Sequence, residues 1–212
     1  HRSLVLRRRF ADLEALTDIA ISFNGGRDGF TSGGRPKLIT PDNRVIIFGA
    51  NQHLGDEQGW QGNPFDLKYF DEGCQLLEAQ VRFHLGWLRP GPGVPATQRC
   101  RAIIGSNPPL DANGDWIIGM FRPWLDLTHP RPAKHGELRW FITDEKGEDV
   151  EVDGPEPVER NGETYIPQSR TFIRAHLGDN PYLSGDSKYK AQLDSLPEPL
   201  RSAIRDGNFM AA

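Results

Sequence analysis

The sequence predicts an α/β fold with a mainly parallel central sheet. Short apolar runs alternate with segments in which apolar residues recur every three or four positions, as expected for strands alternating with helices. Gly- and Pro-rich turns separate these segments and do not gather in a low-complexity tract. With 212 residues, of which 37% are hydrophobic, the chain is long enough for one core, so we expect residues 1–212 to form one domain.

The first half of the chain carries most of the expected sheet. A helix is predicted after the first strand because Leu13, Leu16 and Ile19 lie at helical spacing. A turn is predicted at the glycine-rich stretch 24–34, and a hairpin turn at Pro41-Asp42-Asn43. The strands expected here cover residues 3–6, 37–39, 44–48, 65–70 and 101–104, and the helices cover 12–19 and 76–88.

The second half is expected to add further elements to that sheet. Apolar residues on one face of 115–125 predict a helix packed on the sheet. A hairpin between 138 and 152 is expected as an addition to the sheet, within an insertion of about 138–166. The remaining elements expected are a strand at 169–175 and helices at 187–193 and 199–204.

Composition excludes several classes of function. No apolar run approaches the ~18 residues that a membrane span needs, and the N-terminus does not resemble a signal peptide, so a soluble protein with free Cys74 and Cys100 is expected. The histidines and cysteines show no zinc-ligand spacing. A net charge of −4 argues against a uniformly basic DNA-binding surface. The densest basic patch is Arg7, Arg8 and Arg9, which fits either a solvated strand edge or a contact with phosphate or DNA.

Asp71 and Glu72 follow an apolar run at a predicted strand end, which is the Walker B pattern. In that pattern the Asp holds Mg²⁺ and the Glu polarises the attacking water. A strand end delivers both carboxylates to the crevice where nucleotides bind in parallel sheets. The same residues also fit an ordinary solvated strand-to-helix turn.

Ser106 and Asn107 end the next predicted strand. In a parallel sheet they would lie beside Asp71 and Glu72, where a hydroxyl and an amide could contact a γ-phosphate or its attacking water. The alternative is an ordinary Asn-Pro turn.

Taken in order along the chain, these segments resemble the ATPase domain of the large terminases of tailed phages and prophages. The segments that carry the resemblance are Leu4-Val5-Leu6-Arg7-Arg8-Arg9-Phe10, Trp60-Gln61-Gly62 with 65–72, Gly105-Ser106-Asn107-Pro108, Ser169-Arg170-Thr171-Phe172-Ile173, Asp179-Asn180-Pro181-Tyr182-Leu183, and 196–209. No single segment is highly specific, whereas their order and spacing are.

The resemblance implies a P-loop NTPase fold of the additional-strand, catalytic-Glu type, a three-layer sandwich. It implies Asp71 as the Mg²⁺ ligand, Glu72 as the catalytic base, and Ser106-Asn107 as the element coupling nucleotide state to DNA movement. Such proteins hydrolyse ATP to drive double-stranded DNA into a procapsid in the bacterial cytoplasm. They work as a ring on the portal protein with a small terminase subunit, without a membrane.

Two departures from the family pattern qualify the resemblance. The sequence contains no G-x-x-x-x-G-K-[ST], so we expect the N-terminal P-loop segment, and also the C-terminal nuclease domain, to lie outside this chain. Gln61-Gly62 stands where many members have Arg-Gly, so the arginine finger is not identified. Without a phosphate cradle the chain alone should be inactive, and the alternative is a prophage remnant that binds DNA or a partner protein without catalysis.

Overall fold

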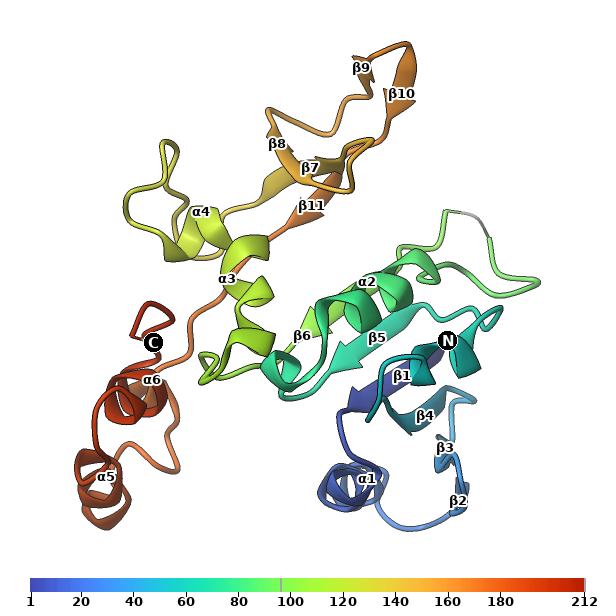
Figure 1. The fold of residues 1–212 in the computed structure, drawn as a ribbon. Coiled ribbons are helices and arrows are strands. Elements are labelled where there is room, and N and C mark those ends of the chain that lie inside the picture. Colours follow the sequence, from blue (N-terminus) through green and yellow to red (C-terminus); the bar gives the residue numbers. More distant parts are fainter. Residues whose placement is uncertain (96, 212) are drawn as a thin grey trace. The chain divides into compact units, whose positions relative to one another are not determined.

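The computed structural model describes residues 1–95 and 97–211, which form two compact units (Figure 1). The first unit spans His1–Gly114, and the second begins at Asp115. No helix in the described ranges is both long and apolar enough to cross a bilayer.

The first unit is built on a six-stranded, mostly parallel sheet, which confirms the α/β prediction at that level. Its strand order is β2-β3-β4-β1-β5-β6, with β4, β1, β5 and β6 parallel and β2 and β3 antiparallel. The strands are β1 (Arg2–Arg7), β2 (Phe30–Thr31), β3 (Lys37–Ile39), β4 (Val45–Ala50), β5 (Leu67–Phe70) and β6 (Arg101–Ile104). Five of them match the predicted strands, and β2 lies within the stretch expected to be only a turn.

Helices cover the two faces of this sheet unequally. Helix α1 (Leu13–Phe23), preceded by η1 (Phe10–Asp12), packs on one face against Phe48 and Val5. Helix α2 (Glu78–Gly86) packs on the other, with the ring of His84 5.9 Å from that of Phe70 (Figure 1). The short helices of this unit are η2 (Asp56–Trp60), η3 (Gly73–Gln75) and η4 (Ala112–Gly114).

Strand register determines which side chains share each face. Val5 lies opposite both Phe48 and Tyr69, and because side chains alternate along a strand, these three point toward the α1 face. Leu6 and Phe70 point the other way and are fully buried on the α2 face. We call these the α1 face and the α2 face.

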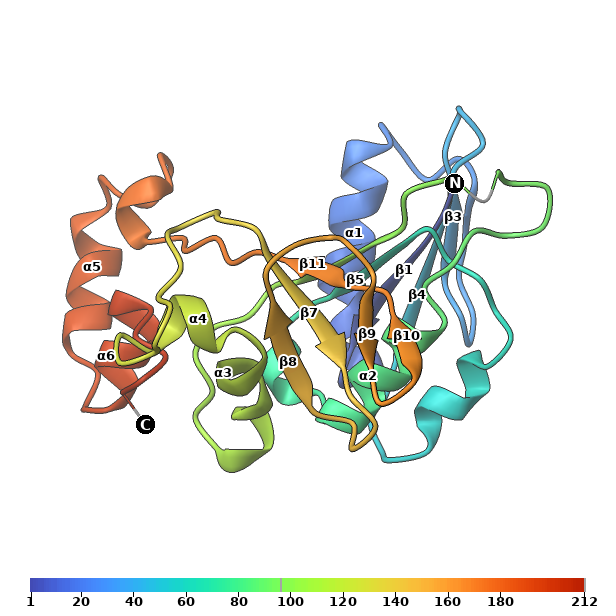
Figure 2. The same cartoon turned by 90° about the horizontal axis from the view of Figure 1, so that it is seen from above.

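The second unit contains a three-stranded antiparallel sheet in the order β11-β7-β8 (Figure 2). Trp124 and Phe141 pack in its core with ring centroids 6.3 Å apart. Its elements are α3 (Trp116–Met120), α4 (Arg122–Leu125), β7 (Arg139–Thr143), β8 (Asp149–Val152), β9 (Val158–Arg160), β10 (Glu163–Tyr165), β11 (Gln168–Arg170), η5 (Leu177–Asp179), α5 (Ser187–Asp194) and α6 (Leu200–Asp206).

Several expectations for this unit need correction. The helix expected at 115–125 is two short helices, because the chain leaves helical geometry at Phe121 and Pro123 offers no backbone N–H to continue the ladder. The strand expected at 169–175 is only β11. The hairpin of β7 and β8 pairs with β11 in a sheet of its own, and does not extend the six-stranded sheet.

Candidate functional site

The carboxyl ends of β1, β5 and β6 meet at one edge of the parallel sheet. The Asp71 amide donates to the Leu6 carbonyl at 2.9 Å, and the Gly105 amide donates to the Phe70 carbonyl at 2.9 Å. The Gly73 amide then returns a bond to the Gly105 carbonyl. The loops after β5 and β6 are therefore adjacent, as the sequence predicts for Asp71-Glu72 and Ser106-Asn107.

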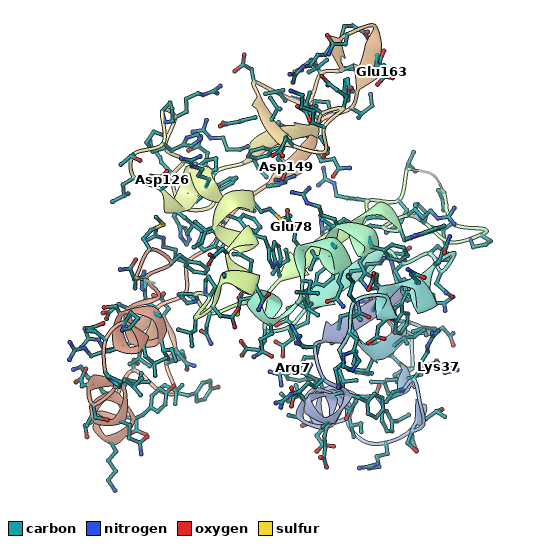
Figure 3. All side chains as sticks on the ribbon, in the orientation of Figure 1. Arg7, Lys37, Glu78, Asp126, Asp149 and Glu163 are labelled. Carbon is teal, nitrogen blue, oxygen red and sulfur yellow. The ribbon has the colours of Figure 1, made fainter. Side chains whose placement is uncertain are left out.

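Arg7 at the end of β1 forms an ion pair with Asp71. Its Nε lies 2.6 Å from Asp71 Oδ2, and both side chains are largely shielded, with 23% and 16% of their surface exposed (Figure 3 labels Arg7). The Tyr69 hydroxyl donates to the other carboxylate oxygen of Asp71 at 3.0 Å. A charge-assisted pair in this partly buried setting is stronger than a surface salt bridge. The acidic residue of the predicted metal site is thus already paired with a cation.

Tyr69 is a site residue that the sequence analysis did not identify. Burial, together with the hydrogen bond to Asp71, raises the pKa of Tyr69 to about 12, so the phenol stays a proton donor at neutral pH. Gly105 is a second missed residue, because a Cβ there would stand 2.7 Å from the Tyr69 hydroxyl. The alternation of side chains along a strand was the available signal, since it predicts Tyr69 and Asp71 on the same face.

Glu72 adopts a left-handed backbone conformation, with φ 50° and ψ 52°. Such a conformation is uncommon for residues other than Gly, Asn and Asp, and it costs about 1–3 kcal/mol. It turns the chain sharply from β5 into η3 and leaves the Glu72 carboxylate at the sheet edge, with Oε1 3.8 Å from Arg7 Nη2. A strained backbone beside paired carboxylates is typical of a functional site.

Ser106 joins the two loops of the site. Its hydroxyl accepts from the Cys74 amide at 3.1 Å and donates to the Asn107 carbonyl at 2.7 Å. Cys74 lies in η3, so this hydroxyl links the loop after β5 to the loop after β6. Burial raises the pKa of the Cys74 thiol, which keeps it protonated and a poor nucleophile.

The arginine cluster is largely engaged by the protein itself. Arg8 Nη1 donates to the Gln75 carbonyl at 2.6 Å, so Arg7 and Arg8 both hold the loop after β5. Arg9 forms a two-point pair with Asp12 at 2.9 and 3.0 Å and is the most exposed of the three. A contact with phosphate or DNA stays a prediction for these residues, and Arg9 is the one best exposed to make it.

The donor set suits a metal ion that arrives with phosphates. Mg²⁺ is commonly held by one or two carboxylates with substrate phosphates and water completing its shell. Asp71 and Glu72 supply two carboxylates, and the Arg7 guanidinium already occupies the position of a cation against Asp71. The described residues contain no cluster of three or more His, Cys, Asp or Glu side chains able to hold a metal ion. Mg²⁺ bound together with a nucleotide stays a prediction for these two carboxylates.

No family model matches this sequence, and a search of curated proteins finds no match.

Proposed function

We propose that this chain is the carboxylate-bearing part of a P-loop ATPase, the DNA-packaging motor of a tailed-phage large terminase. The observation that carries the proposal is the meeting of Arg7, Asp71-Glu72 and Ser106 at the carboxyl edge of a parallel sheet. Nucleotides bind outside this edge in open α/β sheets. The family named in this proposal rests on the order of the sequence segments that resemble terminases.

Each residue of the site has a role in ATP hydrolysis. Asp71 would hold Mg²⁺, which neutralises charge on the phosphates when it is bound. The Glu72 carboxylate would orient the attacking water and accept its proton. Arg7, freed from Asp71 on nucleotide binding, would be available to the phosphate oxygens. The Ser106 hydroxyl would pass the movement of the loop after β5 to the loop after β6.

The free edge of the sheet supports a phosphate cradle beside β6. Within the described residues β6 pairs only with β5, so its other edge can accept one more parallel strand. The loop after such a strand would lie next to Gly105 and Ser106. A glycine-rich loop there could present backbone N–H groups to the phosphates of a nucleotide held by Asp71.

The handedness of the crossovers supports the same arrangement. Connections between parallel strands are right-handed in about 98% of cases. The connection from such a strand to β1 would cross the sheet in the same direction as the connection from β1 to β4. Its helix would therefore pack on the α1 face, as α1 does. On that face Ile103 is 50% exposed. The helix of a P-loop would cover this side chain.

In the motor, the hydrolysis of ATP would be coupled to translocation of double-stranded DNA. The working assembly would be a homo-oligomeric ring on the portal protein, supplied with DNA by the small terminase subunit. These partners rest on the resemblance alone.

The test uses the longest protein encoded in the reading frame that contains His1. We expect an in-phase G-x-x-x-x-G-K-[ST] upstream and DNA-stimulated ATP hydrolysis by that protein. Glu72→Gln should lower turnover about 10²–10⁴-fold, because it removes the base that activates water. The matched control is Glu14→Gln, an exposed glutamate in the first turn of α1, which should leave turnover unchanged.

Two results would reject the motor. Normal turnover in Glu72→Gln would show that the carboxylate has no catalytic role. A reading frame without a P-loop, together with no ATP turnover, would favour the non-catalytic module that binds DNA or a partner, an alternative consistent with the Arg7 pair that neutralises Asp71.

A further inference from the structure

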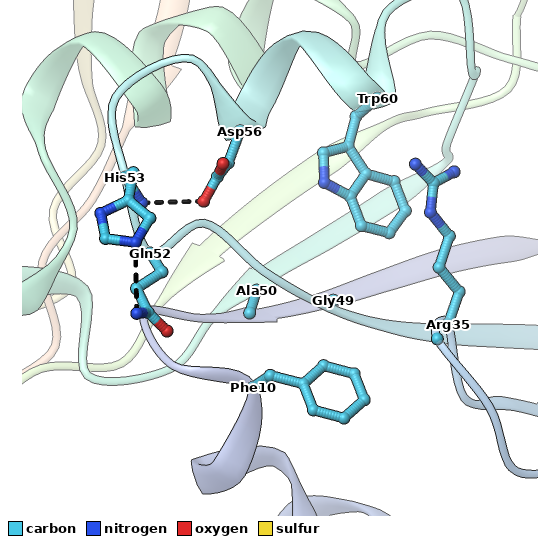
Figure 4. A pocket seen from close by; sticks show the side chains of 9 residues that line it. Phe10, Arg35, Gly49, Ala50, Gln52, His53, Asp56 and Trp60 are labelled. Atoms are coloured by element: carbon cyan, nitrogen blue, oxygen red, sulfur yellow. Dashed lines mark hydrogen bonds between the residues drawn. The ribbon is translucent and has the colours of Figure 1, made fainter.

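A hollow of the first unit lies at the carboxyl end of β4. It has a volume of about 420 Å³, within the range of about 300–1,000 Å³ typical of small-molecule sites. Its walls come from three parts of the chain: Phe10 after β1, Gly34-Arg35 before β3, and the segment from Gly49 to Trp60 (Figure 4). None of these residues takes part in the site around Asp71.

The hollow lies at a topological switch point. The connection that leaves β1 runs through α1 on one face, whereas the connection that leaves β4 runs through η2, whose Trp60 contacts His84 of α2 on the opposite face. The two connections therefore leave the carboxyl ends of adjacent parallel strands toward opposite faces of the sheet. Ligands of open α/β sheets bind in such crevices.

One wall is a preorganised arginine. The Arg35 guanidinium lies 4.2 Å from the centroid of the Trp60 ring, and its Nη2 donates to the Gly59 carbonyl at 2.8 Å. Trp60 is 5% exposed and lies directly on Gly49, where a Cβ would collide with the indole. Stacking fixes the plane of the guanidinium and leaves its remaining donors for a ligand. Such a fork pairs best with phosphate or carboxylate oxygens.

The opposite wall is an exposed aromatic ring. Phe10 is 49% exposed, and Figure 4 shows its ring on the other side of the Gly49-Ala50 backbone from Trp60 and Arg35. The Gln52 amide and the Asp56 carboxylate, which accepts from the His53 amide at 2.8 Å, also line the hollow. The hollow thus offers an apolar ring, hydrogen-bonding groups and an anchored cation in one crevice.

We propose that this crevice binds a nucleotide unit, with the base stacked on Phe10 and the phosphate paired with Arg35. A base is planar and stacks on an aromatic ring, its polar edge can be read by Gln52 and Asp56, and its phosphate matches the guanidinium fork. A free nucleotide and a single strand share this chemistry, and the experiment separates these two sources. The proposal does not depend on the ATPase function, because it uses none of the residues around Asp71.

The experiment measures binding of AMP, adenosine, ribose 5-phosphate and a five-nucleotide single strand to the full chain by isothermal titration calorimetry. Phe10→Ala should weaken binding about tenfold or more, because base stacking is lost. Arg35→Gln should weaken AMP but not adenosine. Phe23→Ala is the matched control, since Phe23 is an 89% exposed phenylalanine of the same unit, and it should change nothing. Unchanged melting temperatures confirm that each variant folds.

The outcomes separate the source of the ligand and the site that binds it. AMP binding that depends on Phe10 identifies a free nucleotide, and binding of the single strand alone with the same dependence identifies a nucleic-acid strand. The proposal is overturned if neither binds, or if Phe10→Ala binds like the unchanged protein. It is also overturned if Asp71→Asn abolishes binding while Phe10→Ala does not, a result that leaves the ATPase proposal intact.

Discussion

The two faces of the six-stranded sheet differ in how completely they are covered. On the α2 face Leu4, Leu6 and Phe70 are fully buried beneath α2. On the α1 face Ile103 is half exposed, and Tyr69 is only partly buried. Arg7 and Asp71 follow Val5 and Tyr69 by two residues, so the candidate chemistry lies on the α1 side.

The α2 face also buries polar groups. Lys68 is fully buried, and its Nζ donates to the His84 carbonyl at 2.5 Å and lies 5.5 Å from the Phe65 ring centroid. His84 Nε2 lies 2.7 Å from Asn51 Nδ2, whereas His84 Nδ1 and Asn51 Oδ1 have no partner in the described residues. The α2 face therefore holds the buried titratable groups that make the stability of this unit depend on pH, whereas the candidate site lies on the α1 side.

The largest expected difference concerns side chains that point to opposite faces. Phe70→Ala should lower the free energy of unfolding by about 3–5 kcal/mol, because a fully buried aromatic side chain leaves a cavity. Ile103→Ala should cost only ~1 kcal/mol, since half of that side chain is already in water. Amide exchange in β5 reports the opening of this unit. Equal costs would show that the Ile103 side chain is also buried in solution.

Acid should destabilise the unit through His84. Burial, with a contribution from the nearby Lys68 charge, lowers the pKa of His84 to about 3 from an ordinary 6.5. Between these two pKa values the unfolded chain binds a proton at His84 that the folded chain does not bind. The free energy of unfolding should therefore fall by a few kcal/mol as the pH is lowered from 6.5 toward 3. A pH titration of unfolding, with the His84 imidazole followed by NMR, checks this. An imidazole of His84 that titrates near 6.5 would contradict it.

Replacing the buried lysine should stabilise the protein. Burial lowers the pKa of Lys68 to about 8 from 10.5, so at neutral pH the folded state carries a charge that burial disfavours. Lys68→Met should raise the free energy of unfolding by about 2 kcal/mol below pH 8, less the lost bond to the His84 carbonyl. The advantage should shrink between pH 8 and 10.5, where the wild-type lysine is neutral only when folded. Lys37→Met, at a half-buried lysine of β3 in the same sheet, is the control, and an advantage independent of pH would contradict the explanation.

The smallest effect is expected at Glu72. Glu72→Gly should stabilise the fold by ~1 kcal/mol, because glycine adopts the left-handed conformation without strain. Chemical denaturation of Glu72→Gly and Glu72→Gln measures it, since Gln removes the charge and keeps the strain. Should both variants gain equally, charge repulsion and not backbone strain would be the cause.

Local patterns in the sequence were sufficient to predict most of the first unit. Apolar runs ending at Asp71 and Gly105 predict β5 and β6, and their neighbouring positions follow from the short β-α-β connection. The ion pair between Arg7 and Asp71 was not predictable, because it joins residues 64 apart and depends on β1 lying between β4 and β5.

The misses have identifiable physical reasons. The left-handed geometry of Glu72 leaves no mark in the sequence, since glutamate rarely adopts it. The hairpin of β9 and β10 was predictable from Asn161-Gly162, a pair that favours the tight turn with positive φ seen at both residues. The break of the expected helix at 115–125 could also have been read from Pro123.

The outer edge of β6 has a consequence for handling the protein. Within the described residues no strand pairs with the other edge of Arg101–Ile104, which lies beside the half-exposed Ile103, and such an edge recruits strands from other molecules. Solutions of this chain should self-associate as concentration rises, and a charged residue in place of Ile103 should suppress that self-association.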